Sequence, residues 1–149
     1  MSRRVCWSAA SDVYKGQDLA GPNRLALCDA QRRGRLGPAE NLLQYAKRIT
    51  VVYHHIDQDS DIPATDYVVD HVGSVSTMIA ERLMKAENVH VTEAESTLLA
   101  LGIHADTGSL TFDSTTPRDA MALAWCLGQG ASQTAIADHA HNSISSEQQ

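Results

Sequence analysis

The sequence predicts an α/β fold in which short buried strands alternate with helices. Two apolar runs, LALC (25–28) and ITVVY (49–53), have the length and composition of buried strands. Between them lies a glycine-containing loop, after which Pro38 occupies the first turn of a helix that continues to about Lys47. Because a strand, a helix and a strand in so short a stretch form a βαβ unit, we expect the two strands to be parallel.

The next segment predicts an edge strand followed by a helix. DYVVDHV (66–72) is rich in β-branched residues and is expected to form a third strand at the edge of the sheet. Ser74 or Ser76 is placed to cap the helix that follows, in which apolar residues recur at helical spacing to about Glu87. The alternation of strand and helix therefore continues beyond the first βαβ unit.

Two further helices with clear N-terminal signals complete the predicted fold. Thr92, with Glu95 three residues later, forms a capping box. A short strand, SLTF (109–112), is expected after that helix. Thr116 then caps a helix in which Pro117 takes the first position and a glycine provides the stop. The expected bounds of the two helices are 93–104 and 117 to Gly128 or Gly130.

The length of 149 residues predicts one domain with a single core. Residues 1–22 show neither helical nor strand periodicity, so we expect an unstructured or non-native N-terminal segment. The domain is expected to span 23–140, and the polar residues 141–149 are expected to form a flexible tail. No apolar run approaches the roughly 20 residues needed to cross a bilayer, so no membrane association is expected.

Net charge and cysteine content restrict the partners and the compartment. A formal net charge of −6 argues against binding of duplex nucleic acid, which normally uses clustered Lys and Arg. The three cysteines, Cys6, Cys28 and Cys126, are widely spaced and contain no CxxC pair, which is typical of reduced thiols. We therefore expect a cytoplasmic protein, with the plastid stroma as the alternative compartment.

Titratable residues follow both of the predicted parallel strands. Asp29 comes directly after the first strand, and His54 and His55 come directly after the second. Because adjacent parallel strands lie about 4.8 Å apart and end at the same edge of the sheet, these side chains can reach a common cation. Asp106, where a helix ends and the chain turns through Gly108, is a third candidate. Mixed oxygen and nitrogen donors suit Mn²⁺ and, less selectively, Mg²⁺, Zn²⁺ or Fe²⁺.

Each of these residues also has an ordinary structural interpretation. Asp29 is a suitable residue to start a polar loop, and a histidine pair after a strand is commonly exposed imidazole. Asp106, placed before Thr and Gly, is a common turn former. A parallel sheet gathers loop residues at one edge in any case, so spacing alone leaves both interpretations open.

From about Leu25 to His139 the chain resembles the DHH phosphoesterase family. An Asp that closes a strand before an Arg-Leu-Gly loop is similar to the family's second motif, and the histidine pair occupies the place of the Asp-His-His motif. The segment around Asp106 and the helix after it form the longest match. Within the family, the chain is most similar to the DHH region that cyanobacterial and plant-type proteins carry ahead of CBS domains and a tRNA nucleotidyltransferase. The matching segments are LALCDAQRRGRLG, VVYHH, VGSVSTMIAE and LLALGIHADTGSLTFDSTTPRDAMALAWCLGQGA.

The resemblance implies a three-layer, Rossmann-like parallel sheet with flanking helices, here an incomplete DHH domain. It also implies manganese-dependent hydrolysis of phosphodiester or phosphoanhydride bonds in nucleotides or short single-stranded oligonucleotides, with Mg²⁺ as the alternative metal. Asp29 would bridge two metal ions, His54 would bind one of them and Asp106 would complete that ion's shell. His55 would face the scissile phosphate as the catalytic residue. CBS and nucleotidyltransferase domains would be covalently linked in the full-length protein.

The chain departs from the family in ways that predict impaired hydrolysis. The family's first motif, an Asp-x-Asp cluster on an N-terminal strand, has no counterpart here, although it supplies most of the first metal's ligands. Tyr53 replaces the Asp of Asp-His-His, so no carboxylate at this position holds a histidine in its metal-binding tautomer. The alternatives are a non-catalytic nucleotide- or metal-binding module of an RNA-processing polypeptide, or a structural fragment of an assembly. The sheet edge left by the missing strand predicts a homodimer or poor solubility.

Overall fold

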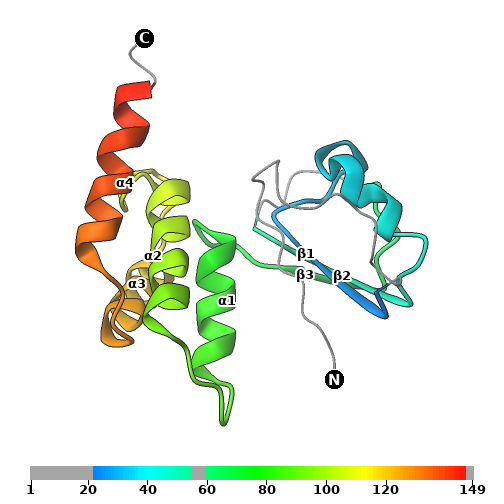
Figure 1. The fold of residues 1–149 in the computed structure, drawn as a ribbon, viewed down its shortest axis with the longest axis horizontal. Coiled ribbons are helices and arrows are strands. Elements are labelled where there is room, and N and C mark those ends of the chain that lie inside the picture. The colour runs from blue at the N-terminus through cyan, green and yellow to red at the C-terminus, as the bar shows by residue number, and fades with distance from the viewer. Residues whose placement is uncertain (1–21, 55–59, 147–149) are drawn as a thin grey trace. The chain divides into compact units, whose positions relative to one another are not determined.

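In the computed structural model, which describes residues 22–54 and 60–146, the chain divides into two compact units, Met1–Val69 and Asp70–Gln149. The first unit contains the strands and the second contains the α-helices (Figure 1). Each unit has a hydrophobic cluster of its own, whereas the length predicts a single core. The predicted N-terminal segment falls, except for Pro22, outside the described residues.

Three parallel strands form the sheet of the described first unit, in the order β1, β2, β3. β1 spans Arg24–Cys28, β2 spans Arg48–Tyr53 and β3 spans Asp66–Val69. Leu27 lies opposite Val51 in the register of β1 and β2. The parallel pairing of the first two strands and the edge position of the third confirm the sequence predictions, although β3 is shorter than predicted.

One face of β1 and most of β2 build the core of the first unit. Every second residue of β1 is buried, whereas β2 is buried over most of its length, as expected for an outer and a central parallel strand. The residue that directly follows the central strand, His54, is buried as well. The buried members of this cluster are Leu25, Leu27, Leu43, Ile49, Val51, Tyr53 and Ile62.

The connection between β1 and β2 is not the α-helix that Pro38 predicts. It forms two short 3₁₀-helices, η1 at Arg33–Arg35 and η2 at Gly37–Leu42, followed by turns. Side chains at every third position of a 3₁₀-helix share one face, and both Leu36 and Leu42 pack against the core. Because a short helix is marginal by itself, this packing overrides the helix propensity of the segment.

The described part of the second unit is built from α-helices. No helix among the described residues is both long enough and apolar enough to cross a membrane. α2 packs against each of the other helices, and α1 also packs against α3. The sequence did not reveal α4, whose backbone continues into the stretch predicted as a tail. The helices are α1 (Val75–Met84), α2 (Glu93–Thr107), α3 (Pro117–Gly128) and α4 (Gln133–Ser146).

The N-terminal caps predicted from the sequence are confirmed. Ser74, rather than the alternative two residues later, caps α1, and its side chain accepts an amide hydrogen bond at 3.1 Å. Thr92 and Glu95 form the predicted capping box at the start of α2. Thr116 precedes α3, and a proline occupies the first turn of that helix. Each of these signals lies within a few residues of the helix end that it specifies.

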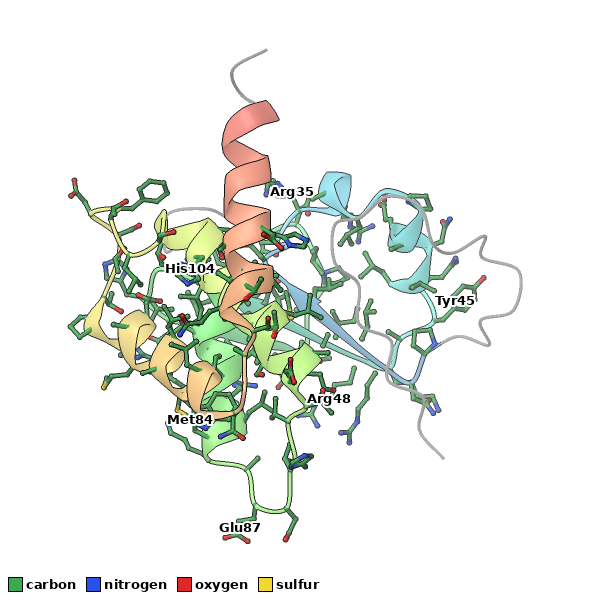
Figure 2. All side chains as sticks on the ribbon, turned by 60° about the vertical axis from the view of Figure 1, so that its left-hand side comes forward. Arg35, Tyr45, Arg48, Met84, Glu87 and His104 are labelled. Atoms are coloured by element: carbon green, nitrogen blue, oxygen red, sulfur yellow. The ribbon has the colours of Figure 1, made fainter. Side chains whose placement is uncertain are left out.

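Small side chains let the helices of the second unit approach closely. Gly102 lies within α2, where a Cβ atom would overlap the side chain of Ser76 in α1. The loop between these two helices carries Glu87, which is labelled in Figure 2. Alanine dominates the core between the helices, so their backbones pack at short range. The buried members of this cluster are Ala80, Ala100, Ile103, Ala122, Cys126, Ala131 and Ile136.

The segment after α2 is a turn, so the strand predicted at 109–112 is wrong. α2 ends at Thr107, and the next residue, Gly108, forms a left-handed cap with a φ of 55°. Ser109 and Leu110 also have positive φ values, 57° and 69°, which no extended strand contains. The carbonyl of the last residue of α2 accepts hydrogen bonds from two amides of this segment. The amides of Thr111 and Phe112 are therefore bonded to the end of α2, whereas in a strand they would bond to a neighbouring strand.

Candidate functional site

Asp29 and His54 lie side by side at the carboxyl ends of β1 and β2. Each residue directly follows its strand, and the two strands are parallel neighbours. The Oδ1 atom of Asp29 is 3.6 Å from the Nε2 atom of His54. The His54 side chain is 7% exposed, whereas that of Asp29 is 45% exposed. The structure thus brings these two predicted ligands together, with the carboxylate accessible to solvent.

The backbone of Asp29 holds this arrangement in place. Its φ of 55° is left-handed, a conformation that Asp tolerates better than most residues. Its amide donates a hydrogen bond to the carbonyl of Val52 at 3.0 Å, which extends the pairing of the two strands. The turn after β1 is therefore tied to β2 close to His54.

The spacing of the two donor atoms fits a shared divalent cation. At 3.6 Å they are too far apart for a hydrogen bond with each other. Neighbouring ligands of an octahedral ion at about 2.1 Å lie about 3 Å apart, so a small side-chain adjustment admits an ion. Within each unit, the described residues contain no group of three His, Cys, Asp or Glu side chains that could hold a metal. The pair therefore needs further ligands to complete a site.

Tyr53 belongs to the hydrophobic core of the first unit. Its ring is buried, and its hydroxyl accepts a hydrogen bond from Nε2 of Gln31 at 2.7 Å. The rings of Tyr53 and His54 meet edge to face, with centroids 6.3 Å apart and an interplanar angle of 70°. The phenol ring therefore packs beside the histidine. The sequence did not reveal the buried Gln31, because a lone glutamine in a loop carries no pattern.

The remaining predicted site residues are Asp106 and His55. Asp106 lies in the second unit, in the last turn of α2, and is exposed. The hydroxyl of Ser74 donates a hydrogen bond to its Oδ2 atom at 2.7 Å. A metal site shared by Asp106, Asp29 and His54 stays a prediction. His55, the predicted catalytic residue, lies outside the described residues.

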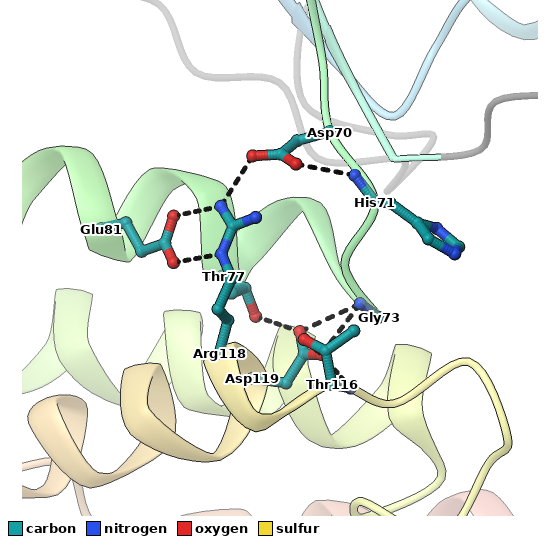
Figure 3. A network of polar contacts seen from close by, with 8 residues as sticks. All are labelled: Asp70, His71, Gly73, Thr77, Glu81, Thr116, Arg118 and Asp119. Carbon is teal, nitrogen blue, oxygen red and sulfur yellow. Dashed lines mark hydrogen bonds and ion pairs between the residues drawn. The ribbon is translucent and has the colours of Figure 1, made fainter.

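A buried carboxylate that the sequence did not reveal connects the start of α1 with the start of α3. Asp119 is fully buried, and Figure 3 shows hydrogen-bond donors converging on it. It accepts hydrogen bonds from the amide of Gly73 (2.9 and 3.1 Å) and the hydroxyl of Thr77 (2.6 Å). The amide and the hydroxyl of Thr116 donate to it as well, at 2.8 and 2.7 Å. Burial by itself raises the pKa of this carboxyl, but the hydrogen bonds, those from Thr77 and Thr116 first, hold the pKa below its usual value.

Arg118 links the same segments by ion pairs. Its guanidinium donates to both oxygens of Glu81, at 2.6 and 2.7 Å, and to Asp70 at 2.7 Å (Figure 3). Hydrogen bonds from Arg118 lower the pKa of both carboxyl groups. Thr116 with an Asp three residues later is a capping pattern that could have pointed to Asp119. No local pattern marks the two partners of Arg118.

No protein-family model matches the chain, but two curated proteins are similar to most of it. Both are named A-adding tRNA nucleotidyltransferase. The protein of Geobacter sulfurreducens is 35% identical over 132 residues, which cover 88% of this chain and 15% of the relative. The protein of Aquifex aeolicus is 36% identical over 132 residues, which cover 89% of this chain and 15% of the relative. The chain therefore corresponds to a small part of each relative.

A solved structure from Methanococcus jannaschii, assigned to the family II inorganic pyrophosphatases, is similar in fold. The TM-score is 0.62 at 20% sequence identity, and the match covers 80% of this chain and 40% of that one. At this identity the likeness shows the fold, and it confirms the predicted α/β class with its parallel sheet. Together with the two relatives, it supports a DHH-like fold. Fusion to CBS domains stays a prediction.

Proposed function

We propose that this chain is a DHH-like phosphoesterase domain of a polypeptide related to tRNA nucleotidyltransferases. Its ligands for a divalent cation, Mn²⁺ by preference and Mg²⁺ otherwise, would be Asp29, His54 and Asp106. Its reaction would be slow hydrolysis of phosphodiester or phosphoanhydride bonds in nucleotides or short oligonucleotides. The observation that carries the proposal is the 3.6 Å approach of Asp29 Oδ1 and His54 Nε2 at the ends of neighbouring parallel strands.

The protein residues divide the work of such a site. Asp29 would supply an oxygen ligand from an accessible side chain, while the buried His54 would supply a nitrogen ligand. Asp106 would add an oxygen ligand, and His55 would face the phosphate. When bound, a divalent cation lowers the pKa of its water and neutralises phosphate oxygens. The names of the two relatives support a nucleotide or a short single-stranded nucleic acid as substrate.

Hydrolysis is expected to be slow because position 53 lacks a carboxylate. A carboxylate beside a metal-binding histidine holds the imidazole in the correct tautomer, and its loss typically costs 10 to 100-fold in affinity or activity. Tyr53 contributes packing in its place, with its hydroxyl engaged by Gln31. Cation binding is therefore expected to survive better than turnover.

The absence of a carboxylate at position 53 also favours a second candidate function, a non-catalytic module that binds a metal or a nucleotide inside an RNA-processing polypeptide. Tyr53 packs in the core where the family has a carboxylate, which is consistent with a site that still binds its ligand but no longer catalyses hydrolysis. The two candidates differ in one measurable property, since a phosphoesterase turns substrate over and a module only binds it.

Isothermal titration with Mn²⁺, combined with hydrolysis assays on bis(p-nitrophenyl) phosphate and short oligoribonucleotides, separates the candidates. The full chain is expected to bind Mn²⁺ and to hydrolyse slowly. Asp29→Ala and His54→Ala are expected to abolish both properties, because each removes one donor of the pair. Binding without turnover would select the module. Turnover unchanged in Asp106→Ala would contradict the phosphoesterase, and no binding at millimolar Mn²⁺ would contradict both candidates.

Matched controls exclude a general effect of losing a carboxylate or an imidazole. Asp113→Ala removes an exposed carboxylate, and His90→Ala removes an exposed imidazole. Neither residue belongs to the proposed site. Both variants are expected to bind Mn²⁺ with the affinity of the unmodified chain, which would tie the losses seen at Asp29 and His54 to the site itself.

A further inference from the structure

We infer that Ser74 is a positioning residue for Asp106, because its buried hydroxyl holds one oxygen of this carboxylate. Asp119 in turn holds the backbone next to Ser74. The inference rests on the proposed role of Asp106 as a metal ligand. Ser74, Asp106 and Asp119 all belong to the second unit.

The hydroxyl of Ser74 has two roles at the start of α1. Its oxygen accepts the hydrogen bond of the Ser76 amide at 3.1 Å, which caps the helix. The same hydroxyl can donate its one hydrogen to either of two acceptors. Its oxygen lies 2.7 Å from Oδ2 of Asp106 and 3.4 Å from the carbonyl oxygen of Gly102. The shorter contact is with a charged acceptor and is the stronger bond. Because Ser74 is fully buried, water does not compete for this hydrogen.

This bond restricts a carboxylate that would otherwise be mobile. An exposed aspartate at a helix end normally samples several side-chain rotamers, and ordering it upon ligand binding costs free energy. With Oδ2 held by Ser74, Asp106 is ordered before any cation arrives, while its Oδ1 atom is not used by this bond. A ligand held in advance loses less entropy on binding, so the site gains affinity.

Asp119 anchors the residue before Ser74. Both of its carboxylate oxygens accept the amide of Gly73, and Oδ1 also accepts the hydroxyl of Thr77 one turn into α1. A side chain on Gly73 could not fit, since its Cβ atom would lie 2.7 Å from Cγ2 of Thr107 and 2.9 Å from Oδ2 of Asp119. The backbone at Ser74 is therefore fixed against α2 and α3 at once.

The decisive variant is Ser74→Gly in the full chain. Glycine is an acceptable N-cap, so this change removes the hydroxyl with little loss of helix stability. Thr92→Ala is the matched control, because it removes the capping hydroxyl of α2 without touching Asp106. Ser74→Ala provides a second variant in which the hydroxyl is absent and a Cβ atom is kept.

The first measurement needs no metal. Three-bond couplings of the Asp106 side chain report its rotamer populations in the metal-free protein. The unmodified chain and Thr92→Ala are expected to show one dominant rotamer, whereas Ser74→Gly and Ser74→Ala are expected to show averaging. A single dominant rotamer in both Ser74 variants would overturn the inference, whatever the outcome for metal binding.

The second measurement is the dissociation constant for Mn²⁺ by isothermal titration. Loss of a partner that orients a metal ligand typically weakens binding 10 to 100-fold, and this is the effect expected for Ser74→Gly. Thr92→Ala is expected to leave the constant unchanged. Averaged rotamers with unchanged affinity would overturn the positioning role. If the unmodified chain binds no Mn²⁺, the proposed function fails, and the rotamer data alone decide whether Ser74 orders Asp106.

Discussion

Both oxygens of the buried carboxylate of Asp119 accept a hydrogen bond from the amide of Gly73, a residue 46 positions earlier in the chain. Two hydroxyl donors and a second amide complete its partners. A buried carboxylate is stable only when its oxygens are satisfied in this way, since burial without partners costs several kcal/mol. The hydrogen bonds between Gly73 and Asp119 therefore attach the start of α1 to the start of α3.

Asp119→Asn is expected to lower the free energy of unfolding by about 2 kcal/mol. The amide keeps the size of the side chain, but its NH₂ group would face N–H and O–H donors that then lack an acceptor. Urea unfolding followed by circular dichroism measures the change. Asp113→Asn, an exposed matched control, is expected to change stability by less than about 0.5 kcal/mol. Equal stability of the two variants would show that the buried bonds contribute little.

Acid is expected to destabilise the second unit through the same carboxyl group. The pKa of Asp119 in the folded protein lies below its usual value, so the unfolded chain binds this proton more readily. Its contribution is complete above the unfolded pKa of about 4 and is lost as the pH falls through the folded pKa. Asp70 and Glu81 act in the same direction, because hydrogen bonds from Arg118 lower the pKa of each.

Urea unfolding midpoints at several pH values between about 7 and 3 test this dependence. The midpoint of the unmodified chain should fall more steeply below about pH 4 than that of Asp119→Asn, which has no proton to gain at this position. Parallel curves for the two proteins would assign the acid sensitivity to other carboxyl groups.

Tyr53→Phe is expected to cost about 1 kcal/mol of stability and to leave Mn²⁺ affinity unchanged. The substitution keeps the buried ring and removes only the hydroxyl that accepts from Gln31. Tyr53→Asp, which would recreate the family motif, removes a core side chain and buries a charge, so it is expected to cost about 3 to 5 kcal/mol. Thermal unfolding and isothermal titration measure the two effects. Weakened binding in Tyr53→Phe would instead give the phenol a part in the site.

Gly102→Ala is expected to destabilise the protein by about 1 to 3 kcal/mol, although alanine is the better helix former by about 1 kcal/mol. The added Cβ atom would overlap Ser76, so α1 and α2 would have to separate. Gly128→Ala is the matched control, because open space surrounds that glycine and helix propensity should prevail there. A pair of thermal unfolding curves shifted in opposite directions confirms the close approach. A higher midpoint for both variants would contradict it.

The elements that the sequence predicted correctly are those whose signals are local. Ser74, Thr92 and Thr116 lie within a few residues of the amides that they cap, so the helix starts could be read directly. The errors arose where tertiary contacts or backbone geometry prevailed. The β1 to β2 connection follows the packing of its leucines, and the left-handed Ser109 and Leu110 turn a strand-like tetrapeptide back onto α2.

In the candidate site, too, the sequence predicted contacts that follow from local position and missed those that depend on tertiary structure. Asp29 and His54 could be paired in advance, because residues that follow neighbouring parallel strands meet at one edge of a sheet. The bond between Ser74 and Asp106 spans 32 positions, and no spacing rule connects a helix cap with a distant aspartate. Gln31 was equally hidden, because its burial depends on the position of Tyr53 in the folded core.

The attachment of Gly73 has a consequence for how the chain opens. Asp70 and Gly73 precede α1, but both are bonded to residues of α3. The side chain of Asp70 accepts a hydrogen bond from Arg118, and the amide of Gly73 donates one to Asp119, so contacts with the helices that follow stabilise this stretch. The boundary between the two units falls directly before Asp70. The Gly73 amide is bonded to Asp119, so we expect its hydrogen to exchange with solvent only when α1 and α3 separate. The exchange rate of this amide therefore measures cooperative opening of the helical unit.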